Sequence, residues 1–158
     1  MSDSVALFHA DHGNLPTAAA IGLAGLTAAK AAMRKQTTLD GLDYLNLEPA
    51  FLVCGPDKEV EALQYLGGTI LAAQASNVNV FVNTMKVIVD PRISGNKWYL
   101  FASPSQIDTI EVAYLDGMSG PEITSEKDFD TSGLKLKCKH VVGVKAIDYR
   151  GMLYNSGA

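Results

Sequence analysis

The clearest pattern in the chain is a strict alternation of side chains near its C-terminal end. From 134 to 140 every even position carries Leu, Cys or His, and every odd position carries a lysine. A period of two is typical of a β-strand with one buried face. The pattern then turns apolar and amphipathic again, which predicts one extended segment over 134–150, straight or bent at Gly143, and about 55 Å long at ~3.3 Å per residue. Because typical strands have about 5–6 residues, we expect this segment to lie along an elongated body and not within one compact sheet.

Periodicity elsewhere predicts two helices and several further strands, and therefore an α+β fold with runs of antiparallel strands. The first helix is expected to begin with Thr27 as N-cap, and the second to begin at Pro56 and end at Gly67. The expected buried stripes are Leu26, Ala29 and Met33 in the first helix and Val60, Leu63 and Leu66 in the second. Other strands are expected at 5–8, 45–54, 78–82, 85–89, 98–102, 107–115 and 122–129.

Composition and charge narrow the function classes. The 158 residues are 47% hydrophobic and 19% charged, as in a soluble globular protein of one domain or two small lobes. The net charge of −4 gives no electrostatic footprint for nucleic acid. The only basic run is Lys135, Lys137 and Lys139, which favours a solvated strand face. Pairing with acidic groups of a neighbouring subunit, or binding of packaged nucleic acid, are the alternatives.

The cysteines and the N-terminus indicate a cytoplasmic context. Cys54 and Cys138 lie far apart in apolar patterns, so we expect two buried, reduced thiols. The start of the chain has no signal-peptide pattern, and its longest apolar stretch is too short to span a bilayer.

Few residues suggest catalysis. His9, Asp11 and His12 could ligate a metal ion in a loop, which gives the alternative of a small metal-dependent enzyme. Cys54 stands at an expected strand-to-helix corner, where a thiolate can be activated, although core packing is the favoured interpretation. The sequence has no phosphate-binding glycine loop and no G-x-S-x-G nucleophile elbow. We therefore expect no enzyme, no cofactor and no metal.

Several short sequence motifs, spread over almost the whole chain, follow one another in an order and spacing that is informative. The runs are Leu7-Phe8 with His12-Gly13-Asn14-Leu15, Ala31-Ala32-Met33-Arg34-Lys35-Gln36, Val89-Asp90-Pro91-Arg92, Trp98-Tyr99-Leu100-Phe101, Ile107-Asp108-Thr109-Ile110-Glu111-Val112-Ala113-Tyr114-Leu115-Asp116-Gly117, Gly120-Pro121 and Ala146-Ile147-Asp148-Tyr149-Arg150-Gly151. In order and spacing they resemble the C-terminal part of tailed-bacteriophage major capsid proteins of the prohead protease–capsid fusion type.

The resemblance implies a partial Hong Kong 97-type capsid fold. It places residues 1–46 and 119–158 in a peripheral-type lobe and residues 47–118 in an axial-type lobe. The chain is too short to include the N-terminal arm, the extended loop and the spine helix of that fold. The protease portion with its catalytic serine and histidine is also missing, so proteolysis is not expected.

The function implied is that of a structural subunit, or fragment, of a phage or prophage capsid shell. Such a subunit self-assembles with other capsid subunits, with packaged DNA on the inner face and no membrane. It is found in the virion, or in the bacterial cytoplasm when it is expressed from a prophage. We expect this short chain not to form closed shells by itself. A turn at the tip of the axial-type lobe is the predicted subunit contact, with an ordinary exposed hairpin as the alternative. It consists of Asp90, Pro91, Arg92, Ile93, Ser94, Gly95, Asn96 and Lys97.

Overall fold

The computed structural model describes residues 4–67, 80–128, 130 and 132–158, and the chain divides into two compact units. The core unit comprises residues 1–109 and 146–158, and the hairpin unit comprises residues 110–145. The two units are defined by contacts within a single chain. The peripheral-type and axial-type lobes are instead defined by the position of each part of a subunit in an assembled shell. The lobe assignment, with 1–46 and 119–158 peripheral and 47–118 axial, therefore stays a prediction.

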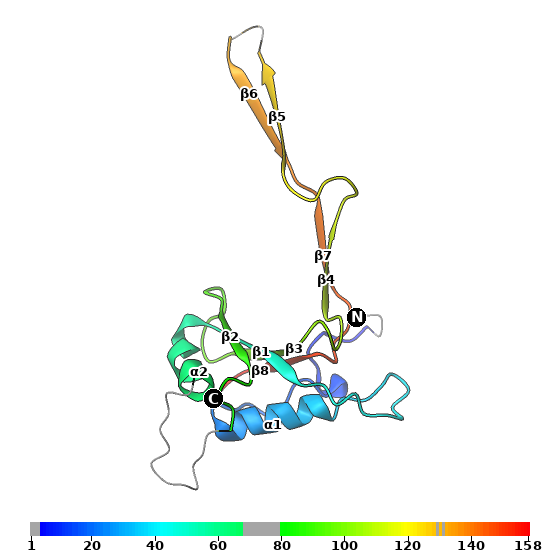
Figure 1. The fold of residues 1–158 in the computed structure, drawn as a ribbon, viewed down its shortest axis with the longest axis vertical. Helices are drawn as coiled ribbons and strands as arrows, with labels where there is room; N and C mark the ends of the chain where they lie inside the picture. Colours follow the sequence, from blue (N-terminus) through cyan, green and yellow to red (C-terminus); the bar gives the residue numbers. More distant parts are fainter. Residues whose placement is uncertain (1–3, 68–79, 129, 131) are drawn as a thin grey trace. The chain divides into compact units, whose positions relative to one another are not determined.

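The structure contains both helices and strands, which confirms the predicted mixed α+β class (Figure 1). The core unit contains η1 (Ala10–His12), α1 (Leu23–Arg34), β1 (Pro49–Cys54), η2 (Pro56–Lys58), α2 (Glu59–Leu66), β2 (Lys86–Val89), β3 (Trp98–Ala102) and β8 (Met152–Asn155). The hairpin unit contains β4 (Ile110–Tyr114), β5 (Glu122–Lys127), β6 (Leu134–Lys139) and β7 (Val142–Ala146).

The core unit is built on a four-stranded sheet with the order β2-β1-β3-β8. Its antiparallel pairs are β1 with β3 and β3 with β8, whereas β1 and β2 run parallel. The expectation of antiparallel runs is therefore wrong for this pair. A parallel pair needs a long crossover connection, and here α2 lies within the connection from β1 to β2.

One face of this sheet packs against the helices and forms the hydrophobic core. Leu52 of β1, Trp98 and Leu100 of β3 and Leu153 of β8 are almost fully buried there. The Trp98 ring nitrogen Nε1 donates a hydrogen bond of 2.9 Å to the Ala19 carbonyl oxygen. This bond satisfies the one polar atom of the indole at the point where it is buried.

Helix α1 confirms the predicted buried stripe and corrects its start. Leu26, Ala29 and Met33 are buried against the sheet. The helix begins at Leu23 after Gly22, before the expected N-cap. The Thr27 hydroxyl instead donates back to the Leu23 carbonyl oxygen at 2.6 Å, which a threonine inside a helix can do.

Helix α2 starts near the expected proline but buries a different stripe. A 3₁₀ turn with Pro56 at its first position leads into Glu59, and Gly67 caps the end. Ala62 and Leu66 are buried, whereas Val60 and Leu63 are exposed. The predicted stripe is therefore confirmed at Leu66 and wrong at Val60 and Leu63, because the helix buries the small Ala62 and not these two larger side chains.

Several predicted strands are confirmed and others are wrong. Strands β1 to β5 all lie within or match the expected ranges. Residues 5–8 form no strand, and residues 80–82 form a turn. Positions 78 and 79 of that expected strand lie outside the described residues.

The expected extended segment over 134–150 is interrupted. Strands β6 and β7 are separated by His140 and Val141, not by a bend at Gly143. After Ala146 the chain turns before β8, where the Met152 N–H donates to the Tyr149 carbonyl oxygen at 3.1 Å. A continuous ribbon to Arg150 was therefore wrong, although 134–139 and 142–146 are extended as predicted.

None of the described helices combines the length and apolar character that a bilayer crossing requires.

Candidate assembly surfaces

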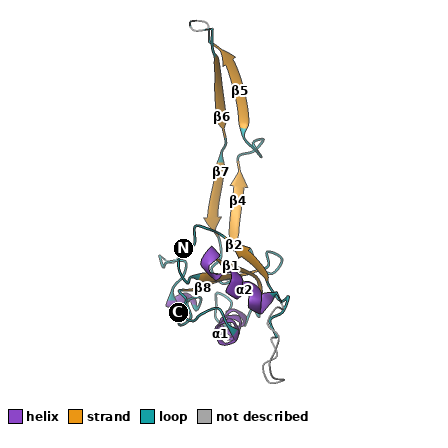
Figure 2. Ribbon diagram, turned by 90° about the vertical axis from the view of Figure 1, so that its left-hand side faces the viewer, coloured by secondary structure: helices purple, strands orange, loops and turns teal. Residues whose placement is uncertain are grey.

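Strands β5 and β6 lie side by side as a two-stranded ribbon (Figure 2). Their register separates two chemically different faces. Residues directly opposite one another in an antiparallel pair share a face. The apolar hairpin face consists of Ile123, Leu134, Leu136 and Cys138, with Ser125 and Lys127 at their cross-strand positions. The charged hairpin face pairs Glu122 with Lys139, Thr124 with Lys137 and Glu126 with Lys135.

The apolar hairpin face is exposed along its whole length. Ile123, Leu134 and Leu136 are 70%, 62% and 69% exposed. A two-stranded ribbon is marginally stable at best on its own in water. On a soluble protein, exposed apolar patches of more than a few hundred Å² mark interaction sites, so this face approaches that size only together with the exposed apolar residues of the β4–β7 ribbon. The two ribbons together therefore present the kind of surface that a partner covers.

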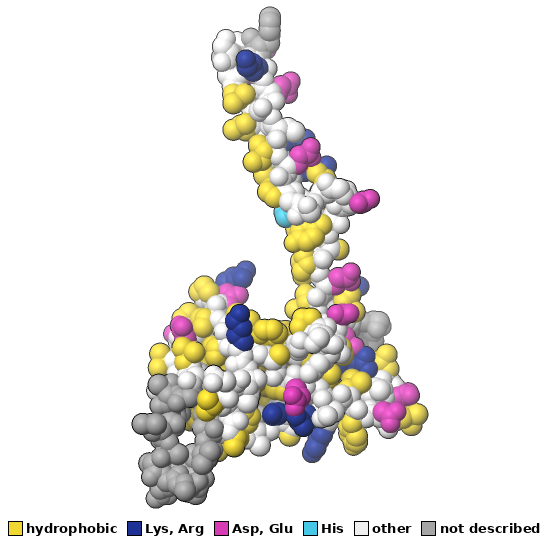
Figure 3. Space-filling model, in the orientation of Figure 1, with side chains coloured by type: hydrophobic (Ala, Val, Ile, Leu, Met, Phe, Trp, Pro, Cys, Tyr) yellow, Lys and Arg dark blue, Asp and Glu magenta, His cyan; other side chains and the backbone are white. Residues whose placement is uncertain are grey.

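The second ribbon of the hairpin unit, β4 with β7, extends the apolar character. Ile110, Val112 and Tyr114 alternate along β4 and are about half exposed, and Val144 of β7 is exposed as well. The Tyr114 ring lies 5.9 Å from the His140 ring, measured between centroids. Figure 3 shows hydrophobic side chains in a row along both ribbons.

The charged hairpin face explains the lysine run. Two of its three lysines lie opposite glutamates, and the Lys135 Nζ atom lies 2.9 Å from an Asp128 carboxylate oxygen. The prediction of a half-buried strand was wrong, since both faces are exposed. The acidic partners Glu122 and Glu126 were missed, although their spacing mirrors the lysines in an antiparallel register. Because acidic side chains lie beside two of the three lysines, the ribbon carries little net positive charge. This favours the prediction of a solvated strand face over the alternative of nucleic-acid binding.

A second apolar surface lies on the core sheet, opposite the helices. Strand alternation places Phe51, Val53, Ile88 and Phe101 on this side, which we call the open sheet face. A hollow of about 190 Å³ lies between them, with Pro104 and Thr109 at its rim. Ile88 is 40% exposed, so the described residues leave this surface only partly covered.

Elsewhere the same side of the sheet is closed by the N-terminal segment. The Phe8 ring lies 5.7 Å from the Tyr99 ring and 5.6 Å from the Tyr154 ring. Burial, and to a lesser degree Tyr154, raises the pKa of the Tyr99 phenol. An apolar side chain supplied by a loop thus already covers the β3–β8 end of this side.

The predicted contact turn, residues 90–97, is well defined and exposed. Asp90 accepts hydrogen bonds from the Arg92 side chain at 3.0 and 2.9 Å and from its backbone N–H at 2.9 Å. These bonds lower the pKa of Asp90. The turn joins β2 to β3 across the end of β1, so it is a connection between strands that are not neighbours and not a hairpin. Whether it contacts other subunits or is an ordinary exposed turn stays a prediction. The Asp90 N–H donates to the Cys54 carbonyl oxygen at 3.0 Å, which anchors the turn to β1.

Comparison with known proteins indicates which class of protein carries these exposed surfaces. A family model described as phage capsid protein matches residues 1–155. The chain belongs to this phage capsid protein family. The resemblance inferred from the short sequence runs is thereby confirmed at the level of a phage capsid protein. A comparison with curated proteins found no match.

Family membership makes the chain a structural protein of the bacteriophage virion that assembles with other capsid subunits. The match spans the core unit and the hairpin unit alike. The hairpin unit is therefore part of what the family shares, and its exposed apolar residues belong to a subunit that functions among neighbours.

In this capsid protein the structure brings two of the three predicted metal ligands together, since His9 Nδ1 lies 3.3 Å from an Asp11 carboxylate oxygen. The His12 ring stacks on the Tyr149 ring at 3.8 Å with an interplanar angle of 9°. His9 Nδ1 accepts the Asp11 N–H at 3.2 Å. Among the described residues no group of three or more potential ligands could hold a metal ion. The cluster instead ties the N-terminal loop to the segment before β8.

The two cysteines of the capsid protein differ from one another. Cys54 is fully buried, and burial, with a contribution from Glu59, raises the pKa of its thiol. A raised pKa opposes formation of the reactive thiolate, so core packing explains this residue. Cys138 is exposed, which corrects the expectation of two buried thiols. The alternation that suggested burial was real, but the described residues do not cover that face.

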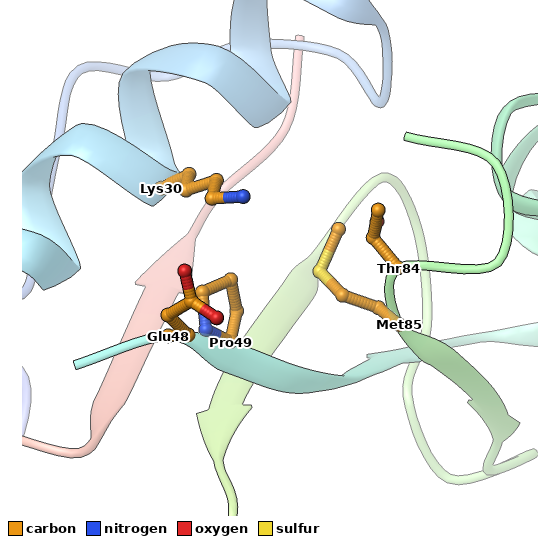
Figure 4. Close-up of a pocket in the computed structure, with 5 residues that line it drawn as sticks. All are labelled: Lys30, Glu48, Pro49, Thr84 and Met85. Carbon is orange, nitrogen blue, oxygen red and sulfur yellow. The ribbon is translucent and has the colours of Figure 1, made fainter. Parts of the chain in front are cut away.

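A hollow beside α1 offers little chemistry either. About 230 Å³ in volume, it is lined by Lys30, Glu48, Pro49, Thr84 and Met85 (Figure 4). The Glu48 carboxylate is already paired with the Arg34 guanidinium. The Thr84 hydroxyl donates a hydrogen bond to the Phe81 carbonyl oxygen at 2.8 Å. The carboxylate and the hydroxyl of the hollow are therefore both engaged in contacts within the fold.

Proposed function

We propose that this chain is a shell-building subunit that self-assembles by covering its apolar hairpin face with neighbouring subunits, and that it performs no catalysis. The exposed row of Ile123, Leu134 and Leu136 carries the proposal. The alternative of a metal-dependent enzyme loses support because His12 is stacked on Tyr149 and not directed at a shared ligand site.

The magnitude of the contact fits assembly by many weak interactions. Full burial of a large aliphatic side chain contributes about 1.5–3 kcal/mol. The three side chains are roughly two-thirds exposed, so covering them contributes about 3–6 kcal/mol. Association costs about 4–15 kcal/mol in lost translational and rotational freedom. One such contact does not hold a stable pair, whereas several contacts per subunit hold an assembly.

The finer assignments of the capsid role are part of the same proposal. The α+β arrangement is compatible with a partial Hong Kong 97-type fold, with residues 1–46 and 119–158 peripheral and 47–118 axial. The exposed turn at 90–97 would then contact neighbours around a symmetry axis. The native gene would be of the prohead protease–capsid fusion type, with packaged DNA on the inner face. Production in the bacterial cytoplasm from a prophage would precede incorporation into the virion.

A charge placed on the apolar hairpin face tests the proposal. Leu136→Glu should abolish concentration-dependent association in sedimentation velocity, because a carboxylate cannot be buried there without a partner. Thr124→Glu on the opposite face is the matched control and should associate like the wild type. Trp98 is the sole tryptophan and fully buried, so its fluorescence reports whether the core unit stays folded. Equal association of both variants would contradict the proposal.

A further inference from the structure

We infer that the apolar hairpin face of one copy docks on the open sheet face of a second copy of the same chain. This inference rests on the proposed self-assembly and names the surface that receives the hairpin. Both surfaces are apolar, and the described residues leave both at least partly uncovered. Because they are different surfaces, each copy offers one of each.

The receiving surface has the shape and lining for aliphatic side chains. Its hollow of about 190 Å³ is walled by Phe51, Val53, Ile88 and Phe101. The hollow is a shallow, open depression and not an enclosed cavity. Aliphatic side chains such as Leu136 or Ile123 can therefore lie on it without displacing the residues around it. Phe8 already packs on the Tyr99 and Tyr154 rings of the same sheet side, which shows that this side takes apolar insertions.

The contact must also propagate. If two hairpin faces packed on one another, the contact would be two-fold symmetric and would end at a dimer, leaving the open sheet face bare. A hairpin face on a sheet face is a heterologous contact, which leaves one free surface of each kind and continues into rings or extended assemblies. A shell requires this second type, and the chain carries both halves of it.

The area available agrees with a weak, repeated contact. Six residues per strand span roughly 20 Å, and two strands cover roughly 10 Å in width, so the β5–β6 face offers roughly 200 Å². A stable pairwise interface buries about 800 Å² on each partner. A single docked hairpin should therefore dissociate readily, and the association should strengthen only as further subunits join.

Mixing two defective variants tests the inference. Leu136→Glu damages the hairpin face and keeps the sheet face, whereas Ile88→Glu damages the sheet face and keeps the hairpin face. Each variant alone should be monomeric in sedimentation equilibrium over a wide concentration range. An equimolar mixture can form one intact contact, and this contact is weak. Its average mass should therefore rise with concentration toward that of a one-to-one pair and never beyond it, while neither variant alone shows such a rise. Thr124→Glu and Val60→Glu are the matched surface controls and should assemble like the wild type.

Each other outcome decides against the inference. Dimers of Ile88→Glu alone, with no gain on mixing, would show hairpin-to-hairpin pairing and would leave the proposed self-assembly intact. Wild-type behaviour of Ile88→Glu would show that the sheet face takes no part. A wild-type chain that stays monomeric at every concentration would remove both the inference and the proposed function. If circular dichroism or Trp98 fluorescence shows that Ile88→Glu is misfolded, Ile88→Thr keeps the β-branch and replaces it in the same mixture.

Discussion

Replacing Gly55 with alanine should destabilise the core unit by pressing on the turn at 90–97. A Cβ atom at position 55 would lie 2.2 Å from the Ile93 carbonyl oxygen and 3.1 Å from its carbonyl carbon. The atom in the way is backbone and not the end of a flexible side chain. The turn, or the corner between β1 and η2, must therefore move by about 1 Å to restore an ordinary contact.

The size of the effect follows from two opposing terms. Gly55 has φ −79° and ψ 167°, a conformation that alanine adopts without strain. Alanine at such a position stabilises by about 0.4–1 kcal/mol through the unfolded chain. Overpacking costs about 1–3 kcal/mol. The variant should therefore lose about 1–2 kcal/mol, or about 2–8 °C in Tm for a chain of this size.

Urea unfolding followed by Trp98 fluorescence measures this loss close to its origin, because Trp98 pairs with Cys54, the neighbour of Gly55. Gly95→Ala is the control. Gly95 has φ +75° and no atom within 4 Å of a Cβ placed on it, so Gly95→Ala reports the cost of a left-handed backbone, about 1–2 kcal/mol, without a clash. A Gly55→Ala protein as stable as the wild type would refute the close packing of the turn on β1.

Three further predictions concern the ion pair, the thiols and the N-terminal histidines. Arg150 holds Asp148 through side-chain and backbone hydrogen bonds that lower the Asp148 pKa against the opposing effect of burial. Asp148→Asn should therefore cost about 1–3 kcal/mol at pH 7, and in pH-dependent denaturation the difference from the wild type should shrink below about pH 4; a constant difference would contradict the pairing. In dilute, unassembled protein Cys138 should react with a thiol reagent at once and Cys54 only on unfolding, and a Cys138 that reacts as slowly as Cys54 would show that the hairpin face is covered before assembly. A chelator should leave the Tm unchanged, and any fall that His12→Ala abolishes would restore the metal hypothesis.

Much of the local structure was predictable because its causes are local. The stripe of Leu26, Ala29 and Met33 repeats at helical spacing and is buried as the period requires. Strand β3 alternates a large buried residue with a half-buried one, from Trp98 to Ala102. The capsid family followed from short runs spread over the chain, which no single element would have identified.

The burial of the hairpin, the open sheet face and the strand pairing depend on contacts between distant parts of the chain, which the periodicity of hydrophobic residues does not encode. Alternation in 134–139 predicts which side chains share a face, but not whether anything covers that face. Burial of Cys138 was therefore expected and not found. The open sheet face was missed because Phe51 and Val53 are as apolar as the buried Leu52 between them. The parallel pairing of β1 with β2 arises from the path of the chain through α2, which strand patterns do not record.

The hairpin unit also bears on how a cell handles subunits that find no neighbours. Exposed hydrophobic surface and unpaired strand edges make a chain prone to aggregation and are what chaperones act on. Under the proposed assembly, a chain left over would display this ribbon continuously, whereas a chain within a finished particle would hide it. The stretch proposed to join subunits would then also distinguish the surplus ones.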